Sequence, residues 1–265
     1  MRLRHHFTCF FLHVLIMATK INNMLLYYGV SMKAFNRDLL KNSIKNSVCR
    51  VYEAQIEDLD LYRNTLDCFS SAIDSVIQGI SLDEWMKQEK ERQVQKTKQN
   101  AIGTLHEEIM GSILGVENLP VGHLIDIVCD KKKIVAEIKN KHNTTKGNHK
   151  VAIYDDLKKA IEQRPGYTAY YVEVLPKGQR VYDKPFTPSD NKSHQQRSEN
   201  QSIRQIDGRS FYALLTGNEN AIEELYNELP IIVAEIINEK YEANLTAEIV
   251  SDSQAFTYNF EKAYG

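Results

Sequence analysis

The chain has 265 residues, of which 42% are hydrophobic and 26% charged, and its formal net charge at pH 7 is −2. This length fits one large domain or two small ones, and the hydrophobic content is sufficient for a buried core. The near-neutral total gives no overall preference for a polyanionic partner, so any such preference must come from the distribution of charge.

The cysteine pattern and the hydropathy pattern each exclude a class of protein. The four cysteines form no CxxC pair and have no histidine at zinc-finger spacing, so we expect reduced cytosolic thiols and no disulfide framework or cysteine metal site. Beyond the N-terminus, no apolar run approaches the length of about 20 residues needed to span a bilayer. The cysteines are Cys9, Cys49, Cys68 and Cys129.

The first residues combine a basic block, 1–6, with an apolar block, 7–17, as a secretory signal does. The apolar block is short, His13 interrupts it, and no clear cleavage site follows. Because Met17 begins an ordinary initiator context, we interpret residues 1–16 as an upstream extension from a start codon assigned too early, with a secretory signal as the alternative. On this interpretation the protein is cytoplasmic.

Residues 17–100 are expected to form a mostly helical N-terminal region. Helices are predicted over 32–46 and 59–80, and Ser81 with Glu84 three residues later forms a capping box that begins a third, very polar helix. The prediction over 59–80 depends on apolar residues at a helical period. They are Leu61, Leu66, Phe69, Ile73 and Ile77.

Residues 101–265 show the alternation of an α/β core. A helix is predicted over 101–114, a strand pair over 124–139, a helix over 151–164, and a strand over the aromatic and β-branched run 167–175. The polar segment 177–209 is too long for a plain connection and is predicted to be a binding or disordered loop. Helices over 208–215, 221–229 and 231–241 follow.

The strand pair within 124–139 carries the most informative residues. If its turn is the dipeptide 131–132, antiparallel pairing sets Asp126 opposite Glu137, with Cβ atoms roughly 5 Å apart. Alternation along the second strand places Lys139 on the same face as Glu137. The sequence therefore predicts that two carboxylates and an ammonium group converge at one point.

Two carboxylates held so close repel each other unless a cation lies between them. Mg²⁺ uses a few carboxylates and keeps several waters, so Asp126, Glu137 and the Ile138 carbonyl are candidate ligands. Such a metal polarises a phosphodiester and activates water, and Lys139 can orient or deprotonate that water. On the preceding helix, Glu107 or Glu108 could add a ligand, and the helical angle makes Glu108 the better candidate, but the favoured interpretation is a helical acid exposed to solvent. The alternative is a surface hairpin in which Lys139 only neutralises the two acids.

Charge is distributed unevenly along the chain. Residues 131–150 hold seven lysines against the single acid Glu137, a local balance of +6, whereas residues 216–265 hold ten acids against two lysines, a balance of −8. A basic segment around the carboxylate pair suits a phosphate-bearing substrate. The alternative is a lysine-rich hairpin exposed to solvent.

The order helix, Asp126 on one strand, Glu137-x-Lys139 on the next, helix, strand resembles the PD-(D/E)xK nuclease superfamily, although Ile125 stands where the motif has proline. Over residues 100–217 the chain is similar to type II restriction endonucleases that cut GGNCC or GGWCC sites. The matching segments are Gly111-Ser-Ile-Leu-Gly, Glu117-Asn-Leu, Val121-Gly-His-Leu-Ile-Asp, Ala136-Glu-Ile-Lys-Asn-Lys, Asn143-Thr, Lys146-Gly, Tyr154-Asp-Asp-Leu, Ile206-Asp-Gly-Arg-Ser-Phe-Tyr and Thr216-Gly.

This resemblance implies a restriction-endonuclease-like core, a mixed central sheet flanked by helices, with additional helices at both ends. It implies Mg²⁺-dependent cleavage of double-stranded DNA by a homodimer, with Asp126 and Glu137 as metal ligands and Lys139 as the catalytic lysine. It also implies a cognate DNA methyltransferase that protects host sites. The alternatives are a non-enzymatic DNA-binding α/β module and a structure-specific repair nuclease.

The loop 177–209 is then predicted to read DNA, because arginine or lysine bound to guanine is the commonest base contact in the major groove. Its candidate arginines are Arg180, Arg197, Arg204 and Arg209. A second group follows the strand pair and is predicted to hold the phosphate backbone. Its members are Asn140, Lys141, Lys146 and Lys150.

Overall fold

The computed structural model describes residues 32, 34–57, 60–62, 65–120, 122–145, 147–190 and 195–265. Residues 34–265 form one compact unit, and the expectations about residues 1–16 lie outside the part described. Within that part, no helix is both long and apolar enough to cross a bilayer. The three cysteines it covers, Cys49, Cys68 and Cys129, are free thiols, as predicted.

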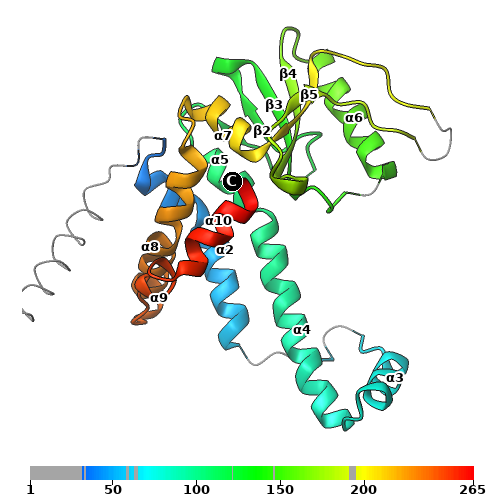
Figure 1. Cartoon of the computed structure of the whole chain (residues 1–265), viewed down its shortest axis with the longest axis vertical. Coiled ribbons are helices and arrows are strands. Elements are labelled where there is room, and N and C mark those ends of the chain that lie inside the picture. Colours follow the sequence, from blue (N-terminus) through cyan, green and yellow to red (C-terminus); the bar gives the residue numbers. More distant parts are fainter. Residues whose placement is uncertain are drawn as a thin grey trace, which may run out of the picture. The chain divides into compact units, whose positions relative to one another are not determined.

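A six-stranded mixed sheet forms the centre of the unit, in the order β1-β2-β3-β4-β6-β5. Strands β3, β4 and β6 are parallel to one another, whereas β1, β2 and β5 run antiparallel to their neighbours at the two sides (Figure 1). The predicted mixed α/β core is confirmed. The strands are β1 (Glu117–Asn118), β2 (Ile127–Cys129), β3 (Ile134–Lys141), β4 (Thr168–Leu175), β5 (Asp183–Pro185) and β6 (Ile203–Asp207).

The register predicted for the strand pair is confirmed, but the turn is not. Ile127 pairs with Ala136, and the Asp126 amide donates to the Ala136 carbonyl at 2.9 Å, so Asp126 lies beside Glu137 as expected. The connection is longer than the expected dipeptide, because residues 130–132 form a 3-10 turn (η1, Asp130–Lys132) that the left-handed Lys133 closes. The longer turn has the same midpoint, so the register is unchanged.

The helices differ from prediction mainly at their ends. Ser81 and Glu84 form the predicted capping box at the start of α4. The helix expected over 59–80 begins only at Cys68, and the helices expected over 221–229 and 231–241 are one helix that contains Pro230. The helices are α2 (Arg37–Ile56), α3 (Cys68–Gln78), α4 (Leu82–Gly103), α5 (Leu105–Gly111), α6 (Gly147–Glu162), α7 (Gly208–Thr216), α8 (Ala221–Tyr241), α9 (Glu248–Ser251) and α10 (Gln254–Tyr264).

Helices cover both faces of the sheet, which explains why its central strands are apolar. On one face α6 packs through Leu157 against a cluster that includes Val135 and Tyr171. On the other face α7 brings Phe211 within 5.5 Å of Tyr170, measured between ring centroids. Burial on both sides makes β4 almost completely inaccessible to solvent, as its aromatic and β-branched run predicted.

The start of α7 lies against β4 so closely that only glycine fits there. A Cβ atom at Gly208 would stand 2.4 Å from the Val174 carbonyl oxygen, far inside contact distance. Asp207, the last residue of β6, caps the helix by accepting a hydrogen bond from the Ser210 amide. The Asp207-Gly208 step therefore allows the chain to pass directly from the sheet into α7.

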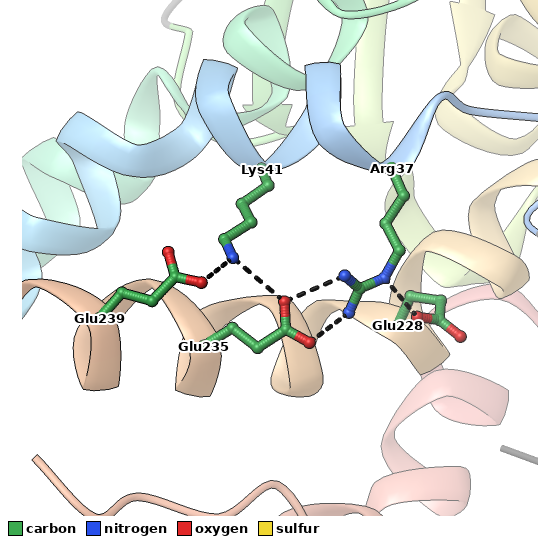
Figure 2. A network of polar contacts seen from close by, with 5 residues as sticks. All are labelled: Arg37, Lys41, Glu228, Glu235 and Glu239. Atoms are coloured by element: carbon green, nitrogen blue, oxygen red, sulfur yellow. Dashed lines mark hydrogen bonds and ion pairs between the residues drawn. The ribbon is translucent and has the colours of Figure 1, made fainter. Parts of the chain in front are cut away.

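An ion-pair network joins α2 to α8 (Figure 2). The Arg37 guanidinium donates to both carboxylate oxygens of Glu235, at 2.7 and 3.0 Å, and lies 3.7 Å from Glu228. Lys41 contacts Glu235 at 3.3 Å and also reaches Glu239. Arg37 donates two parallel hydrogen bonds to one carboxylate. This contact therefore fixes the position of α2 along α8 and also attracts the two helices electrostatically.

We expect Glu235→Gln to lower the free energy of unfolding at pH 7 by about 1 kcal/mol, since it weakens a two-pronged contact that is only partly exposed. The hydrogen bonds from Arg37 lower the pKa of Glu235 below its usual 4.5. The stabilisation is therefore present above pH 4.5 and is lost as the pH falls through the lower pKa of the folded state. Denaturant unfolding at pH 7 and under acidic conditions measures both effects.

Glu239→Gln is the matched control, because Glu239 contacts Lys41 in the same network and its side chain is 57% exposed. Its loss of stability should be smaller than that of Glu235→Gln. Equal losses, or a difference between wild type and Glu235→Gln that persists below the pKa of the folded state, would contradict the assignment.

Candidate active site

The structure brings Asp126, Glu137 and Lys139 together. Asp126 lies just before β2, whereas Glu137 and Lys139 occupy alternate positions on β3 and so project from the same face. The Lys139 Nζ atom is 2.6 Å from Glu137 Oε1 and 4.0 Å from Asp126 Oδ2. The three side chains are between 18% and 24% exposed, so the cluster is mostly withdrawn from water but still open to a ligand.

The main chain of β3 holds the Asp126 carboxylate in place. Its Oδ2 atom accepts a hydrogen bond from the Ile138 amide at 2.6 Å, while its own amide donates to the Ala136 carbonyl. Both contacts come from the neighbouring strand, so the position of this carboxylate follows from the register. A shift of one residue would move Glu137 and Lys139 to the opposite face.

Burial sets the electrostatics of the cluster. It raises the pKa of Asp126, which the hydrogen bond from Ile138 and the charge of Lys139 oppose. It raises the pKa of Glu137 as well, and the negative charge of Asp126 adds to the effect. Burial alone would lower the pKa of Lys139, but the charges of Glu137 and Asp126 outweigh it and the pKa is raised. One ammonium thus faces two carboxylates whose charges repel each other.

Glu107 is a third carboxylate that interacts electrostatically with this cluster. Burial raises its pKa to about 7, and the charge of Asp126 adds to the increase while Lys139 opposes it. Glu108 turns instead toward α2, where its Oε1 atom accepts a hydrogen bond from Ser47 at 2.7 Å. The predicted preference for Glu108 is therefore wrong.

The cause lies in the break between two helices. The prediction treated residues 101–114 as one helix, whereas α4 continues to Gly103 and α5 begins anew at Leu105. The interruption at Thr104 changes the direction in which the later side chains project. No periodicity calculated across the break could assign their faces correctly.

The donor set fits a hard divalent cation that needs few protein ligands. The part of the chain that the structure describes contains no group of three or more His, Cys, Asp or Glu arranged to hold a metal ion, so a closed zinc-type site is not found there. Two carboxylates that repel each other inside a mostly buried site are suited to Mg²⁺, which is commonly bound by one or two carboxylates together with waters and substrate phosphates. Asp126 and Glu137 are the two carboxylates that could hold such an ion.

A second polar cluster borders the site and was not predicted. Glu173 lies beside Lys139 in the parallel register of β3 and β4, and only 4% of its surface is exposed. It accepts hydrogen bonds from Lys150 at 2.8 Å, from the Tyr182 hydroxyl at 2.5 Å and from Gln205 at 2.9 Å. Glu173, an acid in the middle of the apolar run 167–175, was the sequence signal for this cluster, because a buried charge needs hydrogen-bonding or ionic partners.

Two of the lysines predicted to contact DNA share the face of the Asp126, Glu137 and Lys139 cluster. Lys150, in the first turn of α6, is held there by Glu173, and Lys141 follows Lys139 by two positions on β3 and is exposed. Asn140, between Lys139 and Lys141 in sequence, projects to the other face by strand alternation. Lys146 lies outside the described residues.

The four arginines predicted to contact DNA do not lie together. Arg197 donates two hydrogen bonds to Asp155 on α6, at 3.0 and 2.8 Å, and Arg180 is exposed just before β5. Arg204 pairs with Asp183, and alternation along β6 directs it away from the face of Gln205 and Glu173. Arg209 lies on α7, which covers that opposite face. The structure thus does not bring Arg204 and Arg209 to the catalytic face.

A mixed sheet in which Asp126 precedes one strand and Glu137-x-Lys139 occupies the next, all on one face, has the core arrangement of the restriction-endonuclease-like nucleases. The comparisons with known proteins agree with this class. The model of the Eco47II restriction endonuclease family matches residues 34–238, and the chain belongs to that family. It is accordingly a type II restriction endonuclease, a site-specific deoxyribonuclease.

Two curated relatives show how much of the chain this relation covers. The type II restriction enzyme Eco47II of Escherichia coli is 34% identical over 207 residues, which are 76% of this chain and 85% of that protein. The type II restriction enzyme Sau96I of Staphylococcus aureus is 32% identical over 195 residues, 71% of this chain and 75% of that protein. This similarity favours a restriction endonuclease over the two alternatives, a non-enzymatic DNA-binding module and a structure-specific repair nuclease.

Proposed function

We propose that this restriction endonuclease hydrolyses both strands of DNA at a five-base GGNCC-like site, in a Mg²⁺-dependent reaction, as a homodimer. The observation that carries the proposal is the placement of Lys139 2.6 Å from Glu137 and 4.0 Å from Asp126 at a mostly buried point of the sheet. The recognition site comes from the sequence resemblance over residues 100–217.

Each member of the cluster has a role that its position allows. Asp126 and Glu137, with the Ile138 carbonyl, would hold Mg²⁺, which supplies positive charge to polarise the phosphodiester and acidify a bound water. Glu107 interacts electrostatically with the same cluster but does not form a group of three possible metal ligands with Asp126 and Glu137. Lys139, as an ammonium, would orient the attacking water by a hydrogen bond and offset the negative charge that develops on the phosphate oxygens.

The DNA would lie along the face that carries this cluster. Lys141 and Lys150 are positioned there to contact phosphates, which fix the register of the protein on the duplex without specifying sequence. The segment that leads into β6 carries Arg197 on the same side as α6 and is the better candidate for base contacts. A cognate methyltransferase would protect host sites, and the enzyme would act on DNA in the cytoplasm.

Digestion of plasmid DNA in the presence of Mg²⁺, followed by sequencing of the fragment ends, tests the proposed site. We expect discrete fragments whose ends all fall at GGNCC-like sequences, and no cleavage at those sites after cytosine methylation. Cleavage of branched but not linear DNA would instead indicate a structure-specific nuclease. DNA binding without cleavage in any divalent metal would contradict the proposal.

We expect Lys141→Ala to weaken DNA binding by a similar factor on every sequence, because it removes a phosphate contact. The plot of log affinity against log salt concentration should become shallower by about 0.9, the contribution of one phosphate contact. Fluorescence anisotropy in Ca²⁺ across a salt series measures this slope. Lys159→Ala is the matched control, since Lys159 lies in the last turn of α6 and pairs with Asp156. Equal slopes for wild type and Lys141→Ala would rule out the contact.

A further inference from the structure

Helix α3 exposes its apolar side and buries its polar side. The two buried residues are Ser71 and Ser75, each 7% exposed. The large apolar residues of the helix all face solvent, which reverses the usual arrangement of an amphipathic helix at a protein surface. They are Phe69 at 78%, Ile73 at 58%, Val76 at 83% and Ile77 at 77% exposure. We call these four residues the α3 face.

The contacts of α3 explain why this orientation is fixed. The Asp67 carboxylate caps its first turn, and Gly79 ends the helix in the left-handed conformation. The capping box of α4 follows at once, so the two helices are joined by residues 79–81 alone. Trp85 of α4 is buried and its indole nitrogen donates to Asp74 at 3.4 Å. The capped ends and this contact hold the serine side of α3 against its own chain.

The α3 face is large for a surface left in water. Four side chains of this size, each more than half exposed, present on the order of 500 Å² of apolar surface, near the upper end of the roughly 300–600 Å² found for the largest patch of a typical monomer. Leu82, at the start of α4, is also 54% exposed. Two such faces, when completely buried against each other, would remove about 1,000 Å² from water, the lower limit for a specific interface.

The composition of the α3 face suits a second copy of the same chain. A twofold interface uses the same patch on both copies, and residues near the axis meet their own counterparts, so a charge at the centre of the patch would meet a like charge. Asp74 is the one charged residue of α3, and it is engaged by Trp85 on α4. The α3 face therefore offers only apolar groups to its counterpart and carries no charge that would oppose self-association.

The position of α3 leaves the catalytic face free. Helix α4 has 22 residues and is therefore about 33 Å long. Helix α3 packs at the N-terminal end of α4, whereas α5, which carries Glu107, follows its C-terminal end (Figure 1). A contact through α3 would not cover the Asp126, Glu137 and Lys139 cluster.

We propose that the α3 face is the dimerisation surface of this enzyme and packs against the α3 face of a second copy. The inference rests on the proposed homodimeric function. Cleavage of both strands of a duplex in one encounter needs two catalytic clusters, and the described part of the chain supplies one. Dimerisation through α3 joins two of them while leaving each catalytic face open to DNA.

Sedimentation equilibrium of the full chain, without DNA, tests this surface. We expect a dimer for wild type and a dissociation constant about 30-fold or more weaker for Val76→Lys, the loss typical of an interface hot spot. Gln78→Lys is the matched control, because it adds the same charge two positions away at an exposed polar residue of the same helix and should remain dimeric. Circular dichroism and thermal melting check that each variant is folded.

A wild-type chain that sediments as a monomer would overturn the proposal. A Val76→Lys chain that is folded and as strongly dimeric as wild type would also overturn it, as would equal weakening by Gln78→Lys. Val76→Ile should keep the wild-type dissociation constant. Because sedimentation needs no cleavage activity, its result is separate from the outcome of the digestion test.

Discussion

Replacing Lys139 by alanine is expected to lower the rate of DNA cleavage by about 100- to 10,000-fold while leaving DNA affinity almost unchanged. The reason is its position, since its Nζ atom lies 2.6 Å from Glu137 and 4.0 Å from Asp126, where it can hold a water or stabilise negative charge on a phosphate. Single-turnover cleavage of a short duplex, together with anisotropy in Ca²⁺, separates the chemical step from binding.

Lys141→Ala serves as the control for this experiment. It removes the same side chain from the same strand and face, two positions farther along, where the residue is exposed. We expect it to weaken binding and to leave the single-turnover rate at saturating enzyme close to that of wild type. Similar rate losses for the two variants would mean that Lys139 acts only through general electrostatic attraction.

The second large effect concerns the metal. We expect Mg²⁺ to raise the melting temperature of the wild-type chain, because an ion that binds only the folded state at 100 times its dissociation constant stabilises it by about 2.7 kcal/mol. Glu137→Gln keeps the shape of the side chain but removes one of the two proposed carboxylate ligands. It should abolish most of this stabilisation and reduce cleavage by about 1,000-fold or more. Thermal melting with and without Mg²⁺ measures the first effect without any cleavage assay.

Glu117→Gln provides the corresponding control, since Glu117 is an exposed acid on β1, which pairs with β2. Its response to Mg²⁺ should match that of wild type. If Glu137→Gln is stabilised by Mg²⁺ as much as wild type is, then Asp126 and Glu137 do not form the metal site. The melting result would then redirect the search to other carboxylates, beginning with Glu107.

The predicted meeting of Asp126 and Glu137 illustrates what local pattern can determine. The side-chain period of a strand is two, and the apolar runs on either side of the turn allow one register that buries both. The expected two-residue turn was wrong, yet the register was right, because the actual four-residue turn, 130–133, has the same centre. The pairing of the strands therefore set the register, and turns of two or four residues with the same centre are both compatible with it.

Strand β6 could not have been predicted from its own residues. The five residues Ile203–Asp207 stand in a polar stretch and include an arginine, a glutamine and an aspartate. They form a strand because β4 pairs with one edge and β5 with the other. The segment 177–209 was therefore predicted as a loop, although it supplies an interior strand and the Gln205 contact to buried Glu173.

For helix α3 the sequence predicted the helix but not which of its sides is buried. Its apolar period predicted a helix correctly, and such a stripe ordinarily faces the protein's own core. The structure instead buries Ser71 and Ser75 and leaves Phe69 and Val76 in solvent. Periodicity identifies the side of a helix that is apolar, but it cannot say whether the partner of that side belongs to the same chain.

The sequence by itself determined the α/β class, the strand pair with its register, and the convergence of Asp126, Glu137 and Lys139, since these depend on periodicity and on contacts within about fifteen residues. Only the tertiary structure decided that Glu107 and not Glu108 interacts with this cluster, that β6 completes the sheet and that α3 turns its apolar side outward. These features depend on a helix break and on packing between segments far apart in the chain, and neither leaves a local signal in the sequence.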